Sequence, residues 1–382
     1  MRKLYSDSKL VKSVFIIYLI YFFSFFINAD SNLTKLSLPK GFEISIFADG
    51  LESPRQITET QSGFIIVGSK NGDKIFALFD GDRDGYAEMK ITVASGLQNP
   101  TGVTYHNGDL YFAEIEEVWV IKDIDKQLLS DSGNPSIELY MDGLPSETWH
   151  GLRHLNFGPD NNLYIPIGVP CNNCLEPQTE DKRFAAIHKY ENGKLVMVAD
   201  GVRNSVGIDW HPVTKKLYFS DNGRDWLGDN SPSCELNVLD NEGSFFGYPY
   251  KHAKDVIDPE FGKLIPTVNK EFIDPIAELG PHVAPLGIAF YDKDKFPEKY
   301  KNSLFIALHG SWNKYNGKSG YKVIFVKLDS AGNYIYQEDF ITGWLQNEKD
   351  WGRPVSPFIM RDGSMLISDD KHDVIYKIQY KG

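Results

Sequence analysis

One histidine stands where a loop would expose it. His150 precedes Gly151, and a short apolar strand follows. Gly158, Pro159 and Asp160 then predict a turn into a second strand over residues 163–167, so that the stretch reads as a β-hairpin. Imidazole titrates near neutral pH. His150 is therefore the residue of this hairpin that we expect to take part in chemistry.

Arginine and amide side chains stand before other strand-like runs of the chain, as His150 stands before its own. Arginine binds carboxylates through two parallel hydrogen bonds, so several arginines around one opening indicate a site for a polyanionic or multiply oxygenated small molecule. The alternative is that these polar residues only cap strands that face a water-filled channel. The positions are Arg55, Gln98-Asn99, Arg203-Asn204 and Arg353.

Two acidic stretches could bind a hard cation such as calcium, which prefers oxygen ligands. Residues 220–229 combine carboxylates with the bare carbonyl of a glycine at a strand end. Asp80, Asp82 and Asp84 alternate before Gly85, which permits a sharp turn, but Ile91 stands where an EF-hand needs a bidentate acid. A calcium loop and a plain Asp-Gly hairpin turn both explain this second stretch.

Six similar segments must position these residues. Each contains strand-like runs bounded by Gly, Pro, Asn and Asp, and they begin at Pro54, Pro100, His150, Arg203, Pro285 and Arg353. Repeats of roughly 40 to 80 residues with four short strands predict an all-β, six-bladed propeller. We expect the N-terminal strand, residues 42–47, to pair into the last blade and close the ring. The openings of all six repeats then meet at one pocket.

The N-terminus has the pattern of a signal peptide over residues 1–29. Arg2, Lys3, Lys9 and Lys12 precede an apolar run, residues 14–27, and Ala29 offers a cleavage site. An uncleaved anchor is the alternative, although the run is shorter than the roughly 20 residues that span a bilayer. We expect an exported chain, periplasmic or secreted, with one propeller domain over residues 30–382 and no membrane span after cleavage.

The net charge and the cysteines limit the partners and the redox chemistry that we expect. The formal net charge of −12 disfavours nucleic acid as a partner. Cys171 and Cys174 form a close pair, which would indicate redox chemistry or a metal in the cytosol, whereas an oxidising compartment favours a local disulfide. Cys234 is expected to be a lone thiol.

Several longer motifs carry a family resemblance: residues 149–160 (WHGLRHLNFGPD), 202–212 (VRNSVGIDWHP), 221–229 (DNGRDWLGD), 282–288 (HVAPLGI) and 309–312 (HGSW). On these motifs the chain resembles the glucose/sorbosone dehydrogenase family, six-bladed propellers that include soluble sugar dehydrogenases using pyrroloquinoline quinone (PQQ). It is most similar to the branch labelled L-sorbosone dehydrogenase. The resemblance covers nearly all of residues 36–380.

The resemblance implies a role for each matching position. His150 matches the catalytic base, and Arg203 and Asn204 match a pair that contacts the quinone, with Arg203 stabilising the charge that develops during reduction. The backbone carbonyls of Gly223 and Arg224 fall where the family holds its active-site calcium. Three further positions match cofactor contacts or lie near one: Gln98, Arg353 and His309, the last near a cofactor-binding lysine of the family.

The implied activity is the oxidation of a sugar or aldehyde, L-sorbosone or aldose-like, by hydride transfer to PQQ, with calcium as Lewis acid and an external electron acceptor. A non-catalytic propeller that binds a small ligand or a partner protein is the alternative. Trp149, where the family has aspartate, and Val355, where it has a second arginine, favour that alternative. A calcium-dependent lactone hydrolase ranks last, because no Asp or Glu stands at the six openings.

Overall fold

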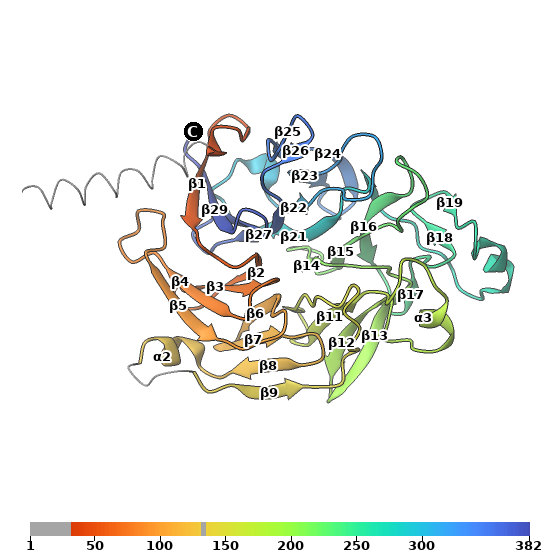
Figure 1. Cartoon of the computed structure of the whole chain (residues 1–382), viewed down its shortest axis with the longest axis horizontal. Helices are drawn as coiled ribbons and strands as arrows, with labels where there is room; N and C mark the ends of the chain where they lie inside the picture. Colours follow the sequence, from red (N-terminus) through yellow and green to blue (C-terminus); the bar gives the residue numbers. More distant parts are fainter. Residues whose placement is uncertain (1–31, 131–134) are drawn as a thin grey trace, which may run out of the picture.

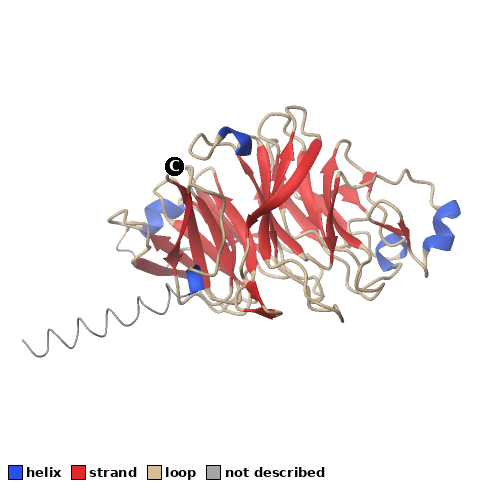
Figure 2. Cartoon of the chain, turned by 90° about the horizontal axis from the view of Figure 1, so that it is seen from above, coloured by secondary structure: helices blue, strands red, loops and turns tan. Residues whose placement is uncertain are grey.

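Six small β-sheets form a ring around a central axis (Figure 1). The structure is a computed structural model that describes residues 32–130 and 135–382. It confirms the predicted six-bladed propeller. The predicted signal peptide, residues 1–29, lies outside the described residues. Figure 2 shows the ring edge-on, with loops gathered at both ends of the blades.

Each blade contains four antiparallel strands, which follow one another from the axis outward. Blades 1 and 2 contain β2 (Pro54–Glu59), β3 (Ile65–Ser69), β4 (Ile75–Phe79), β5 (Met89–Ala94), and β6 (Gly102–His106), β7 (Asp109–Ala113), β8 (Val118–Ile121), β9 (Glu138–Met141). Blades 3 and 4 contain β10 (Asn156–Phe157), β11 (Leu163–Ile167), β12 (Ala186–Glu191), β13 (Lys194–Asp200), and β14 (Ile208–Trp210), β15 (Leu217–Asp221), β16 (Ser233–Leu239), β20 (Ala277–Pro281). A fifth strand, β17 (Ser244–Phe245), pairs in parallel with β13.

Blades 5 and 6 contain β21 (Pro285–Tyr291), β22 (Ser303–Leu308), β23 (Lys322–Leu328), β24 (Tyr334–Ile341), and β27 (Pro354–Ile359), β28 (Met365–Asp369), β29 (Val374–Tyr380), β1 (Phe42–Ala48). Two small hairpins lie outside the blades: β18 (Lys251–His252) with β19 (Val256–Ile257), and β25 (Leu345–Gln346) with β26 (Lys349–Asp350). The short helices are α2 (Ile124–Leu128), α3 (Glu176–Thr179), η1 (Gly262–Thr267) and η2 (Glu298–Tyr300).

The N-terminal strand closes the ring, as predicted. β1 pairs antiparallel with β29, so that Phe42 lies opposite Tyr380 and Ile44 opposite Ile378. The ring of Phe42 also contacts Phe296 and Phe340 edge-on, at centroid distances of 4.8 and 5.0 Å. The outer edge of β29 is therefore paired and covered, which removes an open strand edge.

The second strands of several blades are buried along their whole length. All residues of β3, β11, β22 and β28 are buried, because a neighbouring blade covers each face of the sheet. A strand buried on both faces needs a continuous apolar run rather than alternation, and segments such as SLFIAL in β22 have that pattern. This packing holds the inner strands, and the loops before them, in fixed places around the axis.

We call the end of the ring at which the inner strands begin the mouth. It is formed by the loops that precede β2, β6, β10, β14, β21 and β27. A disulfide joins Cys171 and Cys174 at this end, beside Arg203, and Cys234 is a free, buried thiol, as expected. Within residues 32–130 and 135–382, the helices are all too short or too polar to cross a bilayer.

Candidate active site

The backbone at His150 is left-handed, with φ of 53°. The same conformation recurs at Ser53 (51°), Asn99 (49°) and Ala284 (51°), each near the start of an inner strand. The turn is thus a recurrent feature of these openings rather than local strain at one of them. Blade 3 differs in placing an imidazole at this position.

A single hydrogen bond sets the protonation pattern of His150. Its Nδ1 lies 2.9 Å from the carbonyl oxygen of Val169. A carbonyl oxygen only accepts, so the neutral ring carries its proton on Nδ1 and leaves the lone pair of Nε2 free. Burial, with a smaller contribution from Arg203, lowers the pKa of His150 to about 3. The imidazole is therefore neutral at pH 7 and can accept a proton at Nε2.

Gly168, at the end of β11, allows His150 and Asn204 to lie close together. A methyl group on Gly168 would lie 2.6 Å from Asn204 Oδ1 and 2.7 Å from His150 Cβ. Both distances are shorter than any ordinary van der Waals contact. A glycine is consequently required where blades 3 and 4 bring these two side chains together.

Arg203 is buried and nearly all of its donors are used. Nε donates to the carbonyl of Asn172 at 3.0 Å, and Nη2 donates to Asn172 Oδ1 at 2.9 Å. Nη1 donates to the carbonyl of Asn222 at 3.0 Å, while Asp225 Oδ2 lies 3.4 Å from Nη2. Arg203 therefore acts as a fixed positive charge beside His150 rather than as a mobile side chain.

Asp221 anchors the backbone of the Arg203-Asn204 pair. Its two carboxylate oxygens accept from the amides of Arg203 and Asn204, at 2.8 and 2.6 Å. Burial raises the pKa of Asp221 above its ordinary value, while these hydrogen bonds oppose that shift. Asp225 and Asp229, which follow in the same stretch, also bond to protein donors. The carboxylates of residues 220–229 thus hold protein groups in place.

A second cluster of charges lies on blades 5, 6 and 1, around Asp370. Arg55 Nη1 and His309 Nε2 lie 2.8 and 2.7 Å from its two oxygens, and Lys70 Nζ lies 3.7 Å away. Arg353 donates through Nε to the carbonyl of His309 at 3.1 Å. Arg353, Arg55 and His309, all singled out in the sequence, therefore do meet at the mouth.

This second cluster carries surplus positive charge. Burial opposes ionisation of Asp370, yet His309, Arg55 and Lys70 together hold its pKa well below the usual range. Burial lowers the pKa of His309 to about 4, so this imidazole is neutral at pH 7. Arg55 and Lys70 then share the carboxylate of Asp370, and Arg353, whose guanidinium bonds to the carbonyls of His309 and Gly310, adds a third cation beside them. Burial and, next, the charge of Arg55 lower the pKa of Lys70, as crowded cations require.

The other predicted cofactor and calcium positions lie around these two clusters. Gln98 is exposed, and its backbone amide donates to Glu114 Oε1 at 2.5 Å. The guanidinium of Arg224 pairs with Asp258 at 2.5 Å. Asp258 neutralises this cation, so its charge does not oppose a calcium ion at the carbonyls of Gly223 and Arg224.

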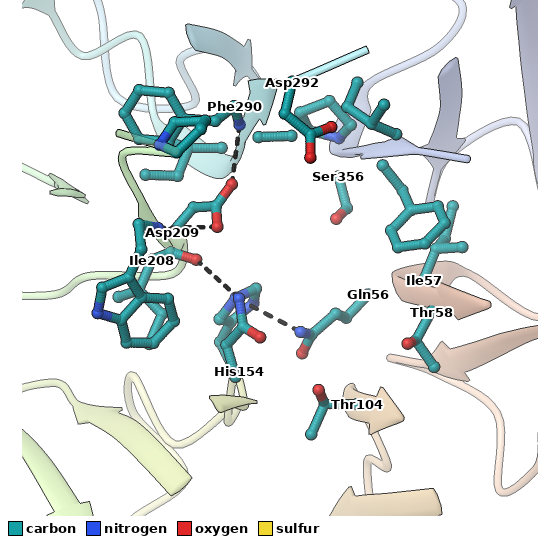
Figure 3. A pocket seen from close by; sticks show the side chains of 18 of the residues that line it. Gln56, Ile57, Thr58, Thr104, His154, Ile208, Asp209, Phe290, Asp292 and Ser356 are labelled. Atoms are coloured by element: carbon teal, nitrogen blue, oxygen red, sulfur yellow. Dashed lines mark hydrogen bonds between the residues drawn. The ribbon is translucent and has the colours of Figure 1, made fainter. Parts of the chain in front are cut away.

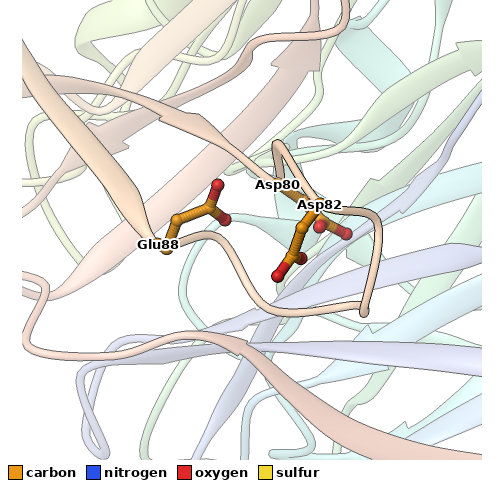
Figure 4. Close-up of side chains that lie close together, drawn as sticks. All are labelled: Asp80, Asp82 and Glu88. Atoms are coloured by element: carbon orange, nitrogen blue, oxygen red, sulfur yellow. The ribbon is translucent and has the colours of Figure 1, made fainter.

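The acidic loop between β4 and β5 lies at the end of the blade opposite the mouth, because β4 begins at the mouth and ends at the opposite end of the blade. Figure 4 shows Asp80, Asp82 and Glu88 facing one another, and one oxygen from each lies within 4.8 Å of the others. Asp84, which the sequence grouped with the first two, instead accepts from the amide of Tyr86 at 2.8 Å. The structure therefore groups Glu88 with Asp80 and Asp82 and leaves out Asp84, the third aspartate that the sequence predicted.

The central channel widens at the end opposite the mouth into a cavity of about 420 Å³ (Figure 3). Asp209 faces this cavity, and its carboxylate accepts from the amides of Phe290 and Trp210, both at 2.8 Å. Burial raises the pKa of Asp209 to about 7. His154 and Gln56 lie between this cavity and the mouth.

Sequence reasoning missed Lys70, Asp370 and Asn172. Lys70 and Asp370 follow the second strands of blades 1 and 6, not the loops that open the blades. Asn172 lies between the paired cysteines. A comparison of the residues that follow all second strands would have shown polar residues at Lys70, Glu114, Asn222, His309 and Asp370.

Known proteins are similar to this chain in sequence or in architecture. A protein of Borreliella burgdorferi is 37% identical over 374 residues, which are 93% of each chain. The structure matches the calcium structure of a Trichoderma reesei protein of Carbohydrate-Active Enzymes Family AA12, with a TM-score of 0.75, 18% identity and coverage of 90% of this chain and 97% of that one. It also matches the holo form of the pyranose dehydrogenase PQQ domain from Coprinopsis cinerea, with a TM-score of 0.74, 18% identity and the same coverage.

The structural matches confirm the resemblance predicted from the motifs, since the fold is that of PQQ-dependent soluble sugar dehydrogenases. One protein family also matches the chain by sequence, over residues 67–377. On that match, the chain belongs to the family described as "Domain of unknown function (DUF7133)".

Proposed function

We propose that this chain is a quinoprotein oxidoreductase that oxidises a sugar or an aldehyde, L-sorbosone or aldose-like. The observation that carries the proposal is the pairing of a neutral imidazole, His150, with a fixed cation, Arg203, at one mouth. A general base with a free Nε2 and a nearby positive charge are what the removal of a hydroxyl proton with hydride transfer requires.

The residues at the mouth fit PQQ, which carries several carboxylates. The surplus charge of Arg55, Lys70 and Arg353 suits such a polyanion, and Arg203 and Asn204 lie at the opening of blade 4, at the same mouth. The carbonyls of Gly223 and Arg224 offer the hard oxygen ligands that calcium prefers. When bound, PQQ would accept the hydride and calcium would act as a Lewis acid on its carbonyl.

The protein then has two tasks. His150 Nε2 accepts the proton of the substrate hydroxyl, while Val169 holds the ring and its Nδ1 proton in place. Arg203, immobilised by Asn172 and Asn222, stabilises negative charge that develops beside it. We further infer that an external acceptor takes up the two electrons and that the chain is exported after cleavage near Ala29.

The test uses the chain purified without cofactor. PQQ and calcium are added separately and together, and dye reduction is followed with aldoses, sorbosone and simple aldehydes. Turnover that needs both additions and is lost in His150→Ala supports the proposal. Quinone binding without turnover on any of these substrates, or no quinone binding at all, would instead favour the non-catalytic binding module.

A further inference from the structure

The loop closed by the Cys171–Cys174 disulfide lies beside the two proposed reacting groups. It follows β11 and precedes α3. Residues 169–174, which we call the disulfide segment, contact both His150 and Arg203. Val169 accepts from His150 Nδ1 through its carbonyl and donates its amide to the carbonyl of Arg203 at 3.0 Å. One short segment therefore touches the base and the cation together.

Asn172 makes the most extensive contacts of this segment. Its carbonyl and its Oδ1 both accept from Arg203, at 3.0 and 2.9 Å. Oδ1 also accepts from the amide of Asp225 at 2.8 Å, and Nδ2 donates to the carbonyl of Asp225 at 3.1 Å. The side chain of Asn172 thus links Arg203 to the loop that begins at Asn222.

Asn173 contacts the ion-pair partner of Arg224, one of the two residues whose carbonyls were predicted to bind calcium. Its Nδ2 donates to Asp258 Oδ2 at 3.1 Å. The same oxygen lies 2.5 Å from Arg224 Nη1 and 2.9 Å from His252 Nε2. Two consecutive asparagines, both inside the disulfide loop, therefore reach the partners of Arg203 and Arg224.

The two cysteines anchor this loop to the protein core. The amide of Cys174 donates to the hydroxyl of Tyr248 at 2.9 Å, and Cys171 Sγ lies 3.5 Å from the same hydroxyl. Tyr248 is buried against Val169 and Ala185. The bridge closes a very short loop, so it restricts the unfolded chain little. The bridge and the hydroxyl of Tyr248 together fix both ends of the loop that carries the two asparagines.

We propose that the disulfide segment is the positioning element of the site: Asn172 orients Arg203, Val169 orients His150, and the Cys171–Cys174 bridge keeps both contacts formed. The inference rests on the proposed function for its effect on turnover. Asn172 touches Arg203 and not the reacting atoms, so it is a positioning residue. Residues that orient metal ligands through a hydrogen bond commonly matter by about 10- to 100-fold in affinity or activity, and we expect an effect at the lower end of that range here.

The test compares Asn172→Ala, Asn172→Asp and the double variant Cys171→Ser/Cys174→Ser in the full chain. Asn172→Ala is expected to lower PQQ affinity and turnover by about tenfold, and the double variant is expected to do the same. Asn172→Asp keeps an oxygen that accepts from Arg203 and from the Asp225 amide, so it is expected to recover part of the loss. Asn162→Ala, in the turn of the same blade away from the mouth, is the matched control.

A second measurement does not depend on the proposed function. Amide hydrogen exchange of Asp225, whose N–H bonds to Asn172 Oδ1, is expected to become faster in Asn172→Ala and to stay unchanged in Asn162→Ala. If the wild-type chain binds no PQQ, the proposed function fails, while faster exchange at Asp225 still supports positioning. Unchanged exchange at Asp225, or wild-type turnover in both Asn172→Ala and the double variant, would overturn the inference.

Discussion

Arg55 Nη1 lies 2.8 Å from Asp370 Oδ2, and the two side chains are only 7% and 4% exposed. This pair joins blade 1 to blade 6, the two blades brought together when β1 closes the ring. A buried charge needs a well-placed partner of opposite charge, and Arg55 and Asp370 are such partners for each other. The positive cluster at the mouth therefore forms only when the ring is closed, because the ion pair spans the junction between these two blades.

His150→Gln is expected to remove turnover while leaving the fold and PQQ binding intact. Glutamine preserves much of the side-chain volume but cannot accept the substrate proton. The loss should be about 10²- to 10⁴-fold in kcat, the usual contribution of a general base. Dye-linked kinetics measure turnover, and quenching of protein fluorescence by PQQ measures binding. Wild-type kcat in the variant would exclude His150 as the base.

The pH dependence follows from the pKa of His150, about 3. The neutral ring is the active form, and it is protonated only as the pH falls toward that value. We therefore expect kcat/KM to show no imidazole limb near the ordinary pKa of about 6.5. Replacing Arg203 with glutamine removes a charge that lowers this pKa, so the pKa should rise. Imidazole titration by nuclear magnetic resonance checks both statements, and an ordinary pKa in the wild type would contradict them.

Gly168→Ala is expected to disable the site with little effect on the rest of the fold. The added methyl would displace Asn204 Oδ1 or His150 Cβ, both under 3 Å away, and such misplacement can cost about 100-fold in rate. Gly193→Ala is the control, because its φ of 76° makes alanine unfavourable by about 1–2 kcal/mol in a turn with open space around it. Equal loss of turnover in both variants would indicate general destabilisation instead.

Lys70→Ala is expected to weaken PQQ binding, and Lys70→Arg to restore it. The side chain of Lys70 is 37% exposed, so solvent screens its charge and the loss should be modest, about two- to fivefold in Kd. Added salt should reduce the difference. Lys194→Ala, at the exposed first residue of β13, controls for a change in net charge. Equal affinities for wild type and Lys70→Ala would remove Lys70 from the site.

Calcium is expected to bind the acidic loop of blade 1 through Asp80, Asp82 and Glu88. A ligand that binds only the folded chain raises the melting temperature as its concentration rises above Kd. Asp82→Asn and Glu88→Gln should abolish this part of the shift, whereas Asp84→Asn should keep it, because Asp84 lies outside the group whose oxygens come within 4.8 Å of one another. A shift that survives Glu88→Gln would place the ion elsewhere, for example at Gly223 and Arg224.

The architecture could be predicted from the order of residues along the chain. Six similar runs of short strands specify six blades, and an unpaired strand before the first repeat predicts closure by β1, because an open edge must find a partner. The same repeats predicted that His150, Arg203, Asn204 and Arg353 share one mouth, since equivalent positions of equivalent blades meet around the axis. Burial of the second strands on both faces is likewise visible as continuous apolar runs.

The pairing of individual side chains, in contrast, became visible only in the folded chain. From the sequence, Asp225 is a candidate metal ligand. In the structure, its carboxylate accepts hydrogen bonds from Arg203 and Asn313. Glu88, rather than Asp84, completes the acidic group of blade 1, because the loop brings the Glu88 carboxylate near those of Asp80 and Asp82. Lys70 and Asp370 meet only when the ring closes. Such contacts depend on distances of a few ångströms between blades, which repeat pattern and residue type do not specify.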